Sequence, residues 1–266
     1  MPVKEDTPLG PERLGLSERD IMYLLVFREL HKHAASPSEI YDVVRRELQI
    51  IERGRARSYL YAVVIQMESY GWIEQVPNHL KNNKKYYITT QSGREKVESF
   101  RESCLSTISA LKGMADHFAY NITGTGNPVP PELTTVQRRM FNRLINVRHL
   151  MRYLFLKILK EPDHQVETGK NIWNLLKERH QWQLAQGYFY ELVREMESEQ
   201  GYIRGEWTTP RRSSCVYRLT DQGVDSLENE GEVALYFIRQ LQKYTSFILN
   251  LFPENHEDLS LTSTLT

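Results

Sequence analysis

Apolar residues recur at helical spacing along much of the chain, and the pattern is clearest between residues 56 and 70. Positions i, i+3, i+4 and i+7 of this segment are apolar, as in a helix that buries one face and exposes the other. Gly71 follows, and glycine readily takes the left-handed conformation that ends many helices. We therefore predict a helix over 56–70 with one face in a core. The residues of that face are Leu60, Val63, Val64 and Met67.

Two further helices are predicted before this one. The first covers residues 18–33. The second begins in the sequence SPSE, where Ser36 can cap the helix, Pro37 suits its first turn and Glu39 completes a capping box. Both segments carry apolar residues at helical spacing. Those expected to face the core are Ile21, Leu24, Leu25 and Leu30 in the first helix, and Ile40, Val43, Val44 and Leu48 in the second.

After the third helix the pattern changes to short strands and then returns to helical spacing. WIEQV and KKYYITT alternate around the turn NHLKNN, which predicts a β-hairpin. Thr90 can then cap a long amphipathic helix over 91–118. Three helices, a hairpin and a further helix are typical of a winged helix-turn-helix. In that design the third helix enters a DNA groove and the hairpin contacts the neighbouring backbone.

A second, divergent copy of this unit follows in the chain. SYLYAVVIQMES (58–69) aligns without a gap with GYFYELVREMES (187–198), and six of the twelve positions are identical. The other aligned segments are KKYYITTQSGREKVES (84–99) with SCVYRLTDQGVDSLEN (214–229), and IMYLLVFREL (21–30) with LMRYLFLKIL (150–159). Because the elements recur in the same order, the pattern indicates a duplication.

These patterns predict a mainly α fold with small β-hairpins as wings. We expect two tandem winged helix-turn-helix units, each followed by a long C-terminal helix. The expected segments are a polar N-terminal tail (1–15), the first unit with its C-terminal helix (16–118), a linker rich in Gly, Pro and Thr (119–139), the second unit with its C-terminal helix (140–252), and an acidic tail (253–266).

The composition limits the partners that such a protein can have. The chain has 266 residues, with 34 basic and 34 acidic side chains, so any binding to nucleic acid has to rest on local patches. Its two cysteines are far apart, which argues against a disulfide scaffold and a structural zinc site and favours a reducing compartment. The N-terminal residues lack the apolar stretch of a secretory signal, and no apolar run is long enough to span a bilayer. We expect a soluble, cytoplasmic protein that does not contact membranes.

Basic residues gather where a winged helix-turn-helix would meet DNA. Three arginines at alternate positions open the third helix, and helix N-termini favour phosphate. The exposed side of that helix is small and polar, and it includes a glutamine that can pair with a base edge. The candidate DNA-binding residues are Arg45 and Arg46 in the second helix, Arg53, Arg55, Arg57, Ser58, Tyr61 and Gln66 in and before the third, Lys81, Lys84 and Lys85 in the hairpin, and Arg211 and Arg212 in the second hairpin.

The second copy is less suited to DNA. Its corresponding helix face is expected to expose Tyr188, Tyr190, Glu191, Arg194, Glu195 and Ser198. Two carboxylates on that face would repel phosphate or select cytosine, the base that offers a hydrogen-bond donor. The second unit is therefore expected to contact the DNA backbone through its wing or to have a structural role.

The first unit resembles the PadR-like transcriptional regulators. The recognition helix of that family has the pattern L-Y-x-x-L-x-x-L-E-x-x-G-L-I, and LYAVVIQMESYGWI (60–73) matches its spacing. The family wing has the pattern R/K-K-Y-Y-x-L-T-x-x-G, and KKYYITTQSG (84–93) matches it except for Thr89, where Leu is usual. Ala62 also replaces a common Pro. The resemblance covers residues 18–118 well and 145–250 more loosely.

This resemblance implies a repressor that dimerises through its C-terminal helices, here 91–118 and 224–251. Within one chain these helices would pair as an intrachain pseudo-dimer, and a homodimer of the whole chain is a further possibility. The resemblance also implies a small-molecule effector held between the two units. Trp173, Trp182 and Trp207 are available to line such a pocket.

The sequence contains no recognisable set of catalytic or metal-binding residues. His31 and His33 lie together at a helix end, whereas His149, His164 and His180 are too scattered to complete a metal site. We expect these histidines at the surface or at helix ends. We therefore expect a protein that is not an enzyme and that uses no cofactor.

The leading interpretation is a sequence-specific regulator of transcription, a repressor that reads double-stranded DNA with the helix near 56–70 and the wing near 74–88. A protein-interaction adaptor without DNA binding is one alternative, favoured by the zero net charge. In an adaptor, the arginines would be paired with acids such as Glu47 and Glu52. A replication initiator that recognises direct repeats is another alternative.

Overall fold

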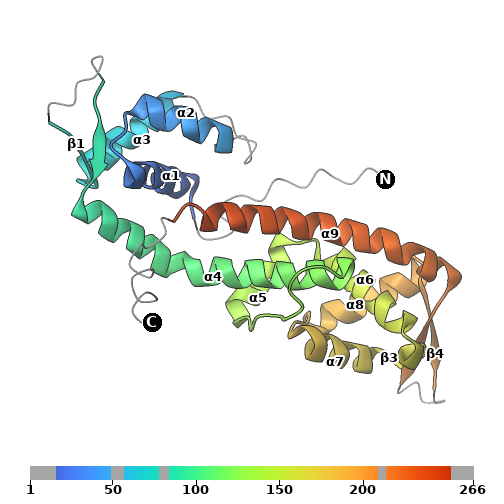
Figure 1. Ribbon diagram of the computed structural model, residues 1–266. Coiled ribbons are helices and arrows are strands. Elements are labelled where there is room, and N and C mark those ends of the chain that lie inside the picture. The colour runs from blue at the N-terminus through green and yellow to red at the C-terminus, as the bar shows by residue number, and fades with distance from the viewer. Residues whose placement is uncertain (1–15, 49–56, 78–83, 209–213, 253–266) are drawn as a thin grey trace, which may run out of the picture. The chain divides into compact units, whose positions relative to one another are not determined.

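The computed structural model describes residues 16–48, 57–77, 84–208 and 214–252, and of residues 46–48 the backbone only. This part of the chain is mainly helical, with small antiparallel sheets (Figure 1). It forms two compact units. One contains the described residues up to Ile108 together with those from Thr245 onward, and the other is Ser109–Tyr244. The boundary falls inside two long helices, α4 (Gln91–Thr123) and α9 (Asp221–Leu249).

The first unit begins with three helices, and all three were predicted from the sequence. They are α1 (Glu18–Lys32), α2 (Pro37–Leu48) and α3 (Arg57–Ser69). At the start of α2, the Ser36 backbone N–H donates to the Glu39 carboxylate at 2.9 Å and the Glu39 N–H donates to the Ser36 hydroxyl at 3.4 Å. The predicted capping box is therefore confirmed.

A two-stranded hairpin follows α3, as predicted. Strand β1 (Ile73–Gln75) pairs antiparallel with β2 (Tyr87–Thr89), and Ile73 lies opposite Thr89. Tyr87 also forms an isolated bridge with Ala35, just before α2, so the hairpin is hydrogen-bonded to the helical part of the unit. In Figure 1 the helices α1–α3 lie together beside this hairpin.

The second unit repeats this order of elements. Its elements after α4 are α5 (Thr135–Leu144), α6 (Val147–Lys160), the 3-10 turn η3 (Pro162–His164), β3 (Glu167–Thr168), α7 (Gly169–His180), α8 (Gln186–Ser198), β4 (Ile203–Trp207), β5 (Cys215–Leu219) and most of α9. The strands form an antiparallel sheet in the order β3-β5-β4. Glu167 of β3 pairs with Tyr217, as Ala35 pairs with the equivalent Tyr87 in the first unit.

A threonine closes the hairpin onto the long helix in both units. The Thr90 hydroxyl donates to the carbonyl of Gly71 at 2.6 Å and accepts the N–H of Gly93 at 3.1 Å. Thr220 makes the same bonds to Gly201 and Gly223, at 2.6 and 3.0 Å. The recurrence of these contacts agrees with the duplication inferred from the sequence.

Two sequence-based expectations about the helices need correction. Val43 was placed in the core but is 42% exposed, because Ile40 and Val44, one turn apart, define the buried face of α2. The predicted linker 119–139 is partly helical, since α4 continues to Thr123 and α5 begins at Thr135. Between these helices Leu133 is buried, so the segment is more than a spacer.

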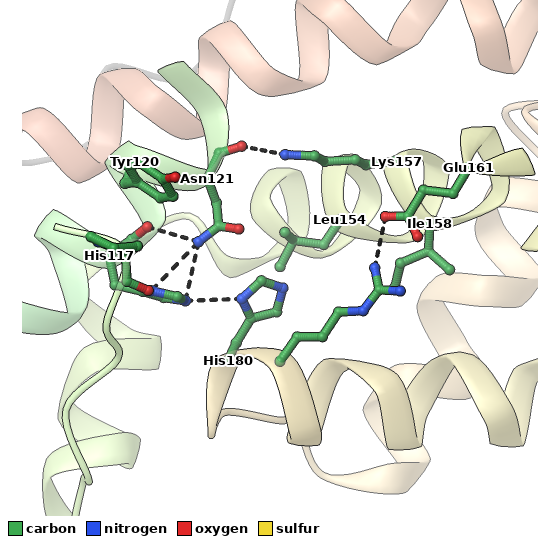
Figure 2. Close-up of a pocket in the computed structure, with 10 residues that line it drawn as sticks. His117, Tyr120, Asn121, Leu154, Lys157, Ile158, Glu161 and His180 are labelled. Atoms are coloured by element: carbon green, nitrogen blue, oxygen red, sulfur yellow. Dashed lines mark hydrogen bonds and ion pairs between the residues drawn. The ribbon is translucent and has the colours of Figure 1, made fainter. Parts of the chain in front are cut away.

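The core of the second unit contains a hydrogen-bonded pair of histidines (Figure 2). The Nε2 of His117 on α4 lies 2.9 Å from the Nδ1 of His180 at the end of α7. Burial lowers the pKa of His117, and burial together with the neighbouring His117, Lys157 and Arg179 lowers the pKa of His180 to about 3. His180 does lie at a helix end, as expected, but it is buried.

We expect Gly93→Ala to destabilise the protein. A Cβ atom at Gly93 would lie 2.1 Å from the backbone oxygen of Trp72, so the hairpin and α4 would have to move apart. The expected loss is about 2–3 kcal/mol, measured by urea unfolding. The neighbouring Ser92 is exposed, and Ser92→Ala should change the stability by less than about 0.5 kcal/mol. Equal stability of the two variants would contradict the close contact at Gly93.

We also expect the stability to fall in mild acid because of His180. The folded protein keeps this imidazole neutral down to about pH 3, whereas the unfolded chain protonates it near pH 6.5. The unfolded state therefore binds more protons between these values, so the stabilising contribution is complete above about pH 6.5 and is lost progressively below it. Between pH 7 and pH 5 the loss from this group should be about 2 kcal/mol.

Thermal unfolding of His180→Gln at both pH values tests this expectation. The variant should be less stable at pH 7 but should lose less stability on acidification than the wild type. His31→Gln removes an exposed histidine and serves as the control. If His180→Gln and the wild type lose the same stability on acidification, His180 is not the group responsible.

Candidate nucleic-acid interface

Helix α3 separates its apolar and polar residues as the sequence predicted. The apolar stripe Leu60, Val63, Val64 and Met67 is buried. Arg57, Ser58 and Tyr61 are exposed on the opposite side, and Ile65 on that side is 63% exposed. A regular helix cannot bury its stripe without turning these residues to solvent, so the predicted orientation of α3 is confirmed.

The N-terminal end of α3 carries a positive charge held by aromatic rings. The Arg57 guanidinium lies 5.7 Å from the ring centre of Tyr61 and 5.9 Å from that of Tyr41 on α2. It also donates to the Tyr61 hydroxyl at 3.5 Å. These contacts limit the freedom of the side chain and leave it exposed, next to backbone N–H groups that favour an anion. Arg53 and Arg55 lie outside the described residues.

Further positive charge comes from α2 and from the hairpin. Arg45, Lys84 and Lys85 are exposed. Within the described ranges, no acidic group lies at ion-pair distance from any of them or from Arg57. Lys81 and the side chain of Arg46 are outside those ranges, as are Glu52 and the side chain of Glu47.

One acid does lie close enough to act on a hairpin lysine. The pKa of Glu39 is lowered, mainly by the backbone N–H of Ser36, and Lys84 adds to the effect. The carboxylate of Glu39 therefore offsets part of the positive charge of Lys84.

Gln66 is less available to a base than the sequence indicated. The Tyr23 hydroxyl on α1 donates to Gln66 Oε1 at 2.9 Å, and Gln66 Nε2 donates to the Tyr70 hydroxyl at 2.6 Å. The side chain is half-buried, and its amide joins α1 to the end of α3. Pairing with a base would require these bonds to open, so Gln66 is the weakest of the described candidates.

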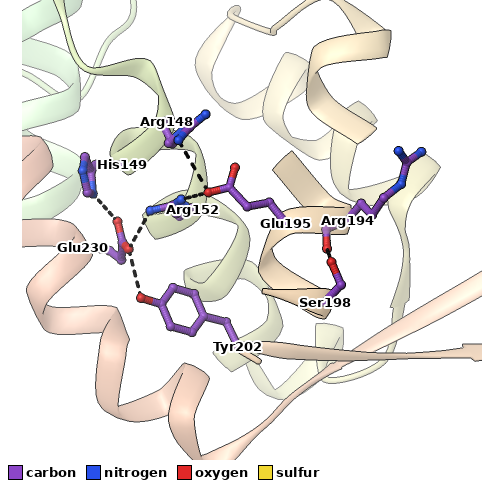
Figure 3. Close-up of polar contacts among 8 residues, drawn as sticks. All are labelled: Arg148, His149, Arg152, Arg194, Glu195, Ser198, Tyr202 and Glu230. Carbon is purple, nitrogen blue, oxygen red and sulfur yellow. Dashed lines mark hydrogen bonds and ion pairs between the residues drawn. The ribbon is translucent and has the colours of Figure 1, made fainter. Parts of the chain in front are cut away.

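In the second unit an ion pair takes the place of the hydrogen bond between Tyr23 and Gln66 (Figure 3). Arg152 on α6 stands at the position of Tyr23, and Glu195 on α8 stands at the position of Gln66. The Arg152 guanidinium donates to the Glu195 carboxylate, and its other terminal nitrogen lies 3.3 Å from Glu230 of α9. Glu230 is also bonded to His149 Nδ1 at 2.6 Å and accepts from Tyr202 at 3.3 Å.

This network corrects two expectations about the second unit. Glu195 was expected on the exposed face of its helix, but its side chain is 12% exposed and neutralised by Arg152. His149 was expected at the surface or a helix end, and it lies in the first turn of α6 but is bonded to the buried Glu230. Glu191, Arg194 and Ser198 are exposed on α8 as expected.

Of the remaining sites expected in the second unit, only the three tryptophans lie in the described part of the chain. Arg211 and Arg212 lie outside the described residues. Trp182 is fully buried, Trp173 is half-buried and Trp207 on β4 is 54% exposed. None of these tryptophans lines a polar pocket that the second unit contains and that was not expected from the sequence. Polar side chains of α4, α6 and α7 line it instead, and no local motif marks them.

No family model matches the sequence, and no curated protein is significantly similar to it. The resemblance to PadR-like regulators therefore rests on the quoted motifs. Each helix in the described ranges is too short or too polar to cross a lipid bilayer.

We expect Glu195→Ala to cost much more stability than Glu191→Ala. Removing the Glu195 carboxylate leaves the buried Arg152 with one acidic partner fewer, at a cost of about 3 kcal/mol. Glu191 is exposed one turn earlier on α8, and its loss should change the stability by less than about 0.5 kcal/mol. Chemical unfolding measures both changes, and two equally mild losses would show that the network contributes little.

Proposed function

We propose that the chain is a sequence-specific double-stranded DNA-binding regulator of transcription, a repressor of the PadR-like kind. In this proposal the two units are tandem winged helix-turn-helix domains, and the first does most of the reading. The observation that carries the proposal is the joint exposure of Arg45, Arg57, Lys84 and Lys85, without an ion-paired acid in the described part of the chain.

The exposed residues of α3 and the lysines of the hairpin have separate roles in this proposal. The exposed side of α3 enters the major groove, where Ser58 and Tyr61 offer hydroxyls to base edges and Ile65 offers an apolar contact to a thymine methyl group. Arg57 binds phosphate at the N-terminus of the helix. Lys84 and Lys85 bind the backbone beside that groove, as the wing does in this class of domain.

The second unit has a mainly structural role in this proposal. Its α8 face exposes the carboxylate of Glu191, and the first residue of α8 is Gln186, where the first residue of α3 is Arg57. The family resemblance further implies that the second unit takes the place of a dimer partner. Homodimerisation of the chain and control by a small-molecule effector belong to the same proposal.

A protein-interaction adaptor is the second candidate. Val43 on α2 and Ile65 on α3 are 42% and 63% exposed, which is more aliphatic surface than phosphate binding needs. A protein partner would cover such side chains. The adaptor predicts that the wild-type chain does not retard duplex DNA even at low salt.

Charge reversal at two positions tests the DNA-binding proposal. The double variant Arg57→Glu, Lys85→Glu should bind a pool of duplex genomic fragments at least about tenfold more weakly than the wild type, because two phosphate contacts become repulsive. Gel retardation at low salt measures the change. Arg239→Glu reverses an exposed charge on α9 and should bind like the wild type. Equal losses in both variants, or no retardation by the wild type, would contradict the proposal.

A further inference from the structure

The second unit contains a polar pocket that the proposed DNA binding does not use (Figure 2). Its walls come from the second half of α4, the segment at Pro128, α6 and α7. About 160 Å³ is open to water-sized molecules. A cavity of about 150 Å³ holds a molecule of the size of benzene, so the pocket has room for a ligand of roughly six non-hydrogen atoms.

One end of the pocket presents an unpaired hydrogen-bond acceptor. The Pro128 carbonyl, 2.7 Å from His117 Nδ1, can only accept, so His117 carries its proton there. His117 Nε2 is then an acceptor, and His180 Nδ1 has to donate to it. This arrangement leaves His180 Nε2 without a proton.

His180 is a buried residue that lines the pocket, and its free nitrogen points into it. The residue is 5% exposed, and its low pKa keeps the ring neutral at neutral pH. In Figure 2 this nitrogen is turned away from His117 toward the side of Leu154 and Ile158, and it has no hydrogen-bond partner among the described residues. A ligand that donates a hydrogen bond would satisfy it.

The wall formed by α6 and the end of α7 is cationic. Lys157 Nζ donates one hydrogen bond to the Asn121 carbonyl and has two further protons, and burial lowers its pKa. Arg179 also lines the pocket and lies 2.7 Å from the Glu161 carboxylate. With both histidines neutral, two cations and one carboxylate face the pocket, so its net charge favours a monoanion.

We propose that this pocket binds a small hydroxy acid, with the carboxylate at Lys157 and the hydroxyl donating to His180 Nε2. The apolar side chains Leu154 and Ile158 contact the short carbon chain. An amino acid fits less well because its ammonium group would face Lys157 and Arg179. The site lies wholly within the second unit, and the proposal does not depend on DNA binding.

Calorimetric titration of the full chain with lactate, glycolate and 3-hydroxybutyrate tests the proposal. At least one of these acids should bind at millimolar concentration or below. Propionate lacks the hydroxyl and 1,2-propanediol lacks the carboxylate, and each should bind at least about tenfold more weakly than the best hydroxy acid, because a buried polar group of the site stays unpaired. If none of the three acids binds, or if propionate binds equally well, the proposal is wrong.

Three variants separate this site from a general effect on folding. Lys157→Met should weaken binding at least about tenfold, because the carboxylate loses its charged partner. Glu161→Gln should tighten binding several-fold, because a competing carboxylate is removed, and a merely damaged fold would not have that effect. Glu178→Gln, which changes an exposed acid on α7, should leave binding unchanged. Unchanged or weaker binding by Glu161→Gln would overturn the proposal.

Discussion

The burial of the apolar stripe of α3 is the constraint on which the first unit depends. Leu60 and Met67, at the two ends of the stripe, are 1% and 0% exposed, so the helix can hardly rotate without exposing core. Its opposite side is thereby fixed toward solvent, with Arg57 at the N-terminal end and Tyr61 one turn later. The exposed charge at the N-terminal end of α3 is a consequence of this packing, and the proposal of DNA binding rests on it.

The two units show how one design can be adapted at a single pair of positions. In the first unit the helices are joined by a neutral bond between Tyr23 and Gln66, and in the second by the ion pair of Arg152 and Glu195. The buried Arg152 guanidinium also needs a second acidic partner, and Glu230 of α9 provides it. Buried charge of this kind is stabilising only while every partner is present. Amino-acid substitutions at these positions are therefore less well tolerated in the second unit than in the first.

Most of the secondary structure could be predicted from the sequence because caps and apolar periodicity are local signals. The stripe of α3, the capping box of α2 and the role of Thr90 follow from residues close in the chain. Contacts between distant residues could not be predicted in this way. The bonds that withdraw Gln66 and Glu195 from the surface each span 43 positions, and the pair of His117 and His180 spans 63.

The salt dependence of DNA binding by the wild-type chain tests the central claim most directly. If Arg45, Arg57, Lys84 and Lys85 each neutralise one phosphate, the logarithm of the binding constant should fall with the logarithm of salt concentration with a slope of about −3 to −4. Contacts by basic residues outside the described ranges would make it steeper. A slope near zero, or the absence of binding at low salt, would contradict the assignment of this face to DNA.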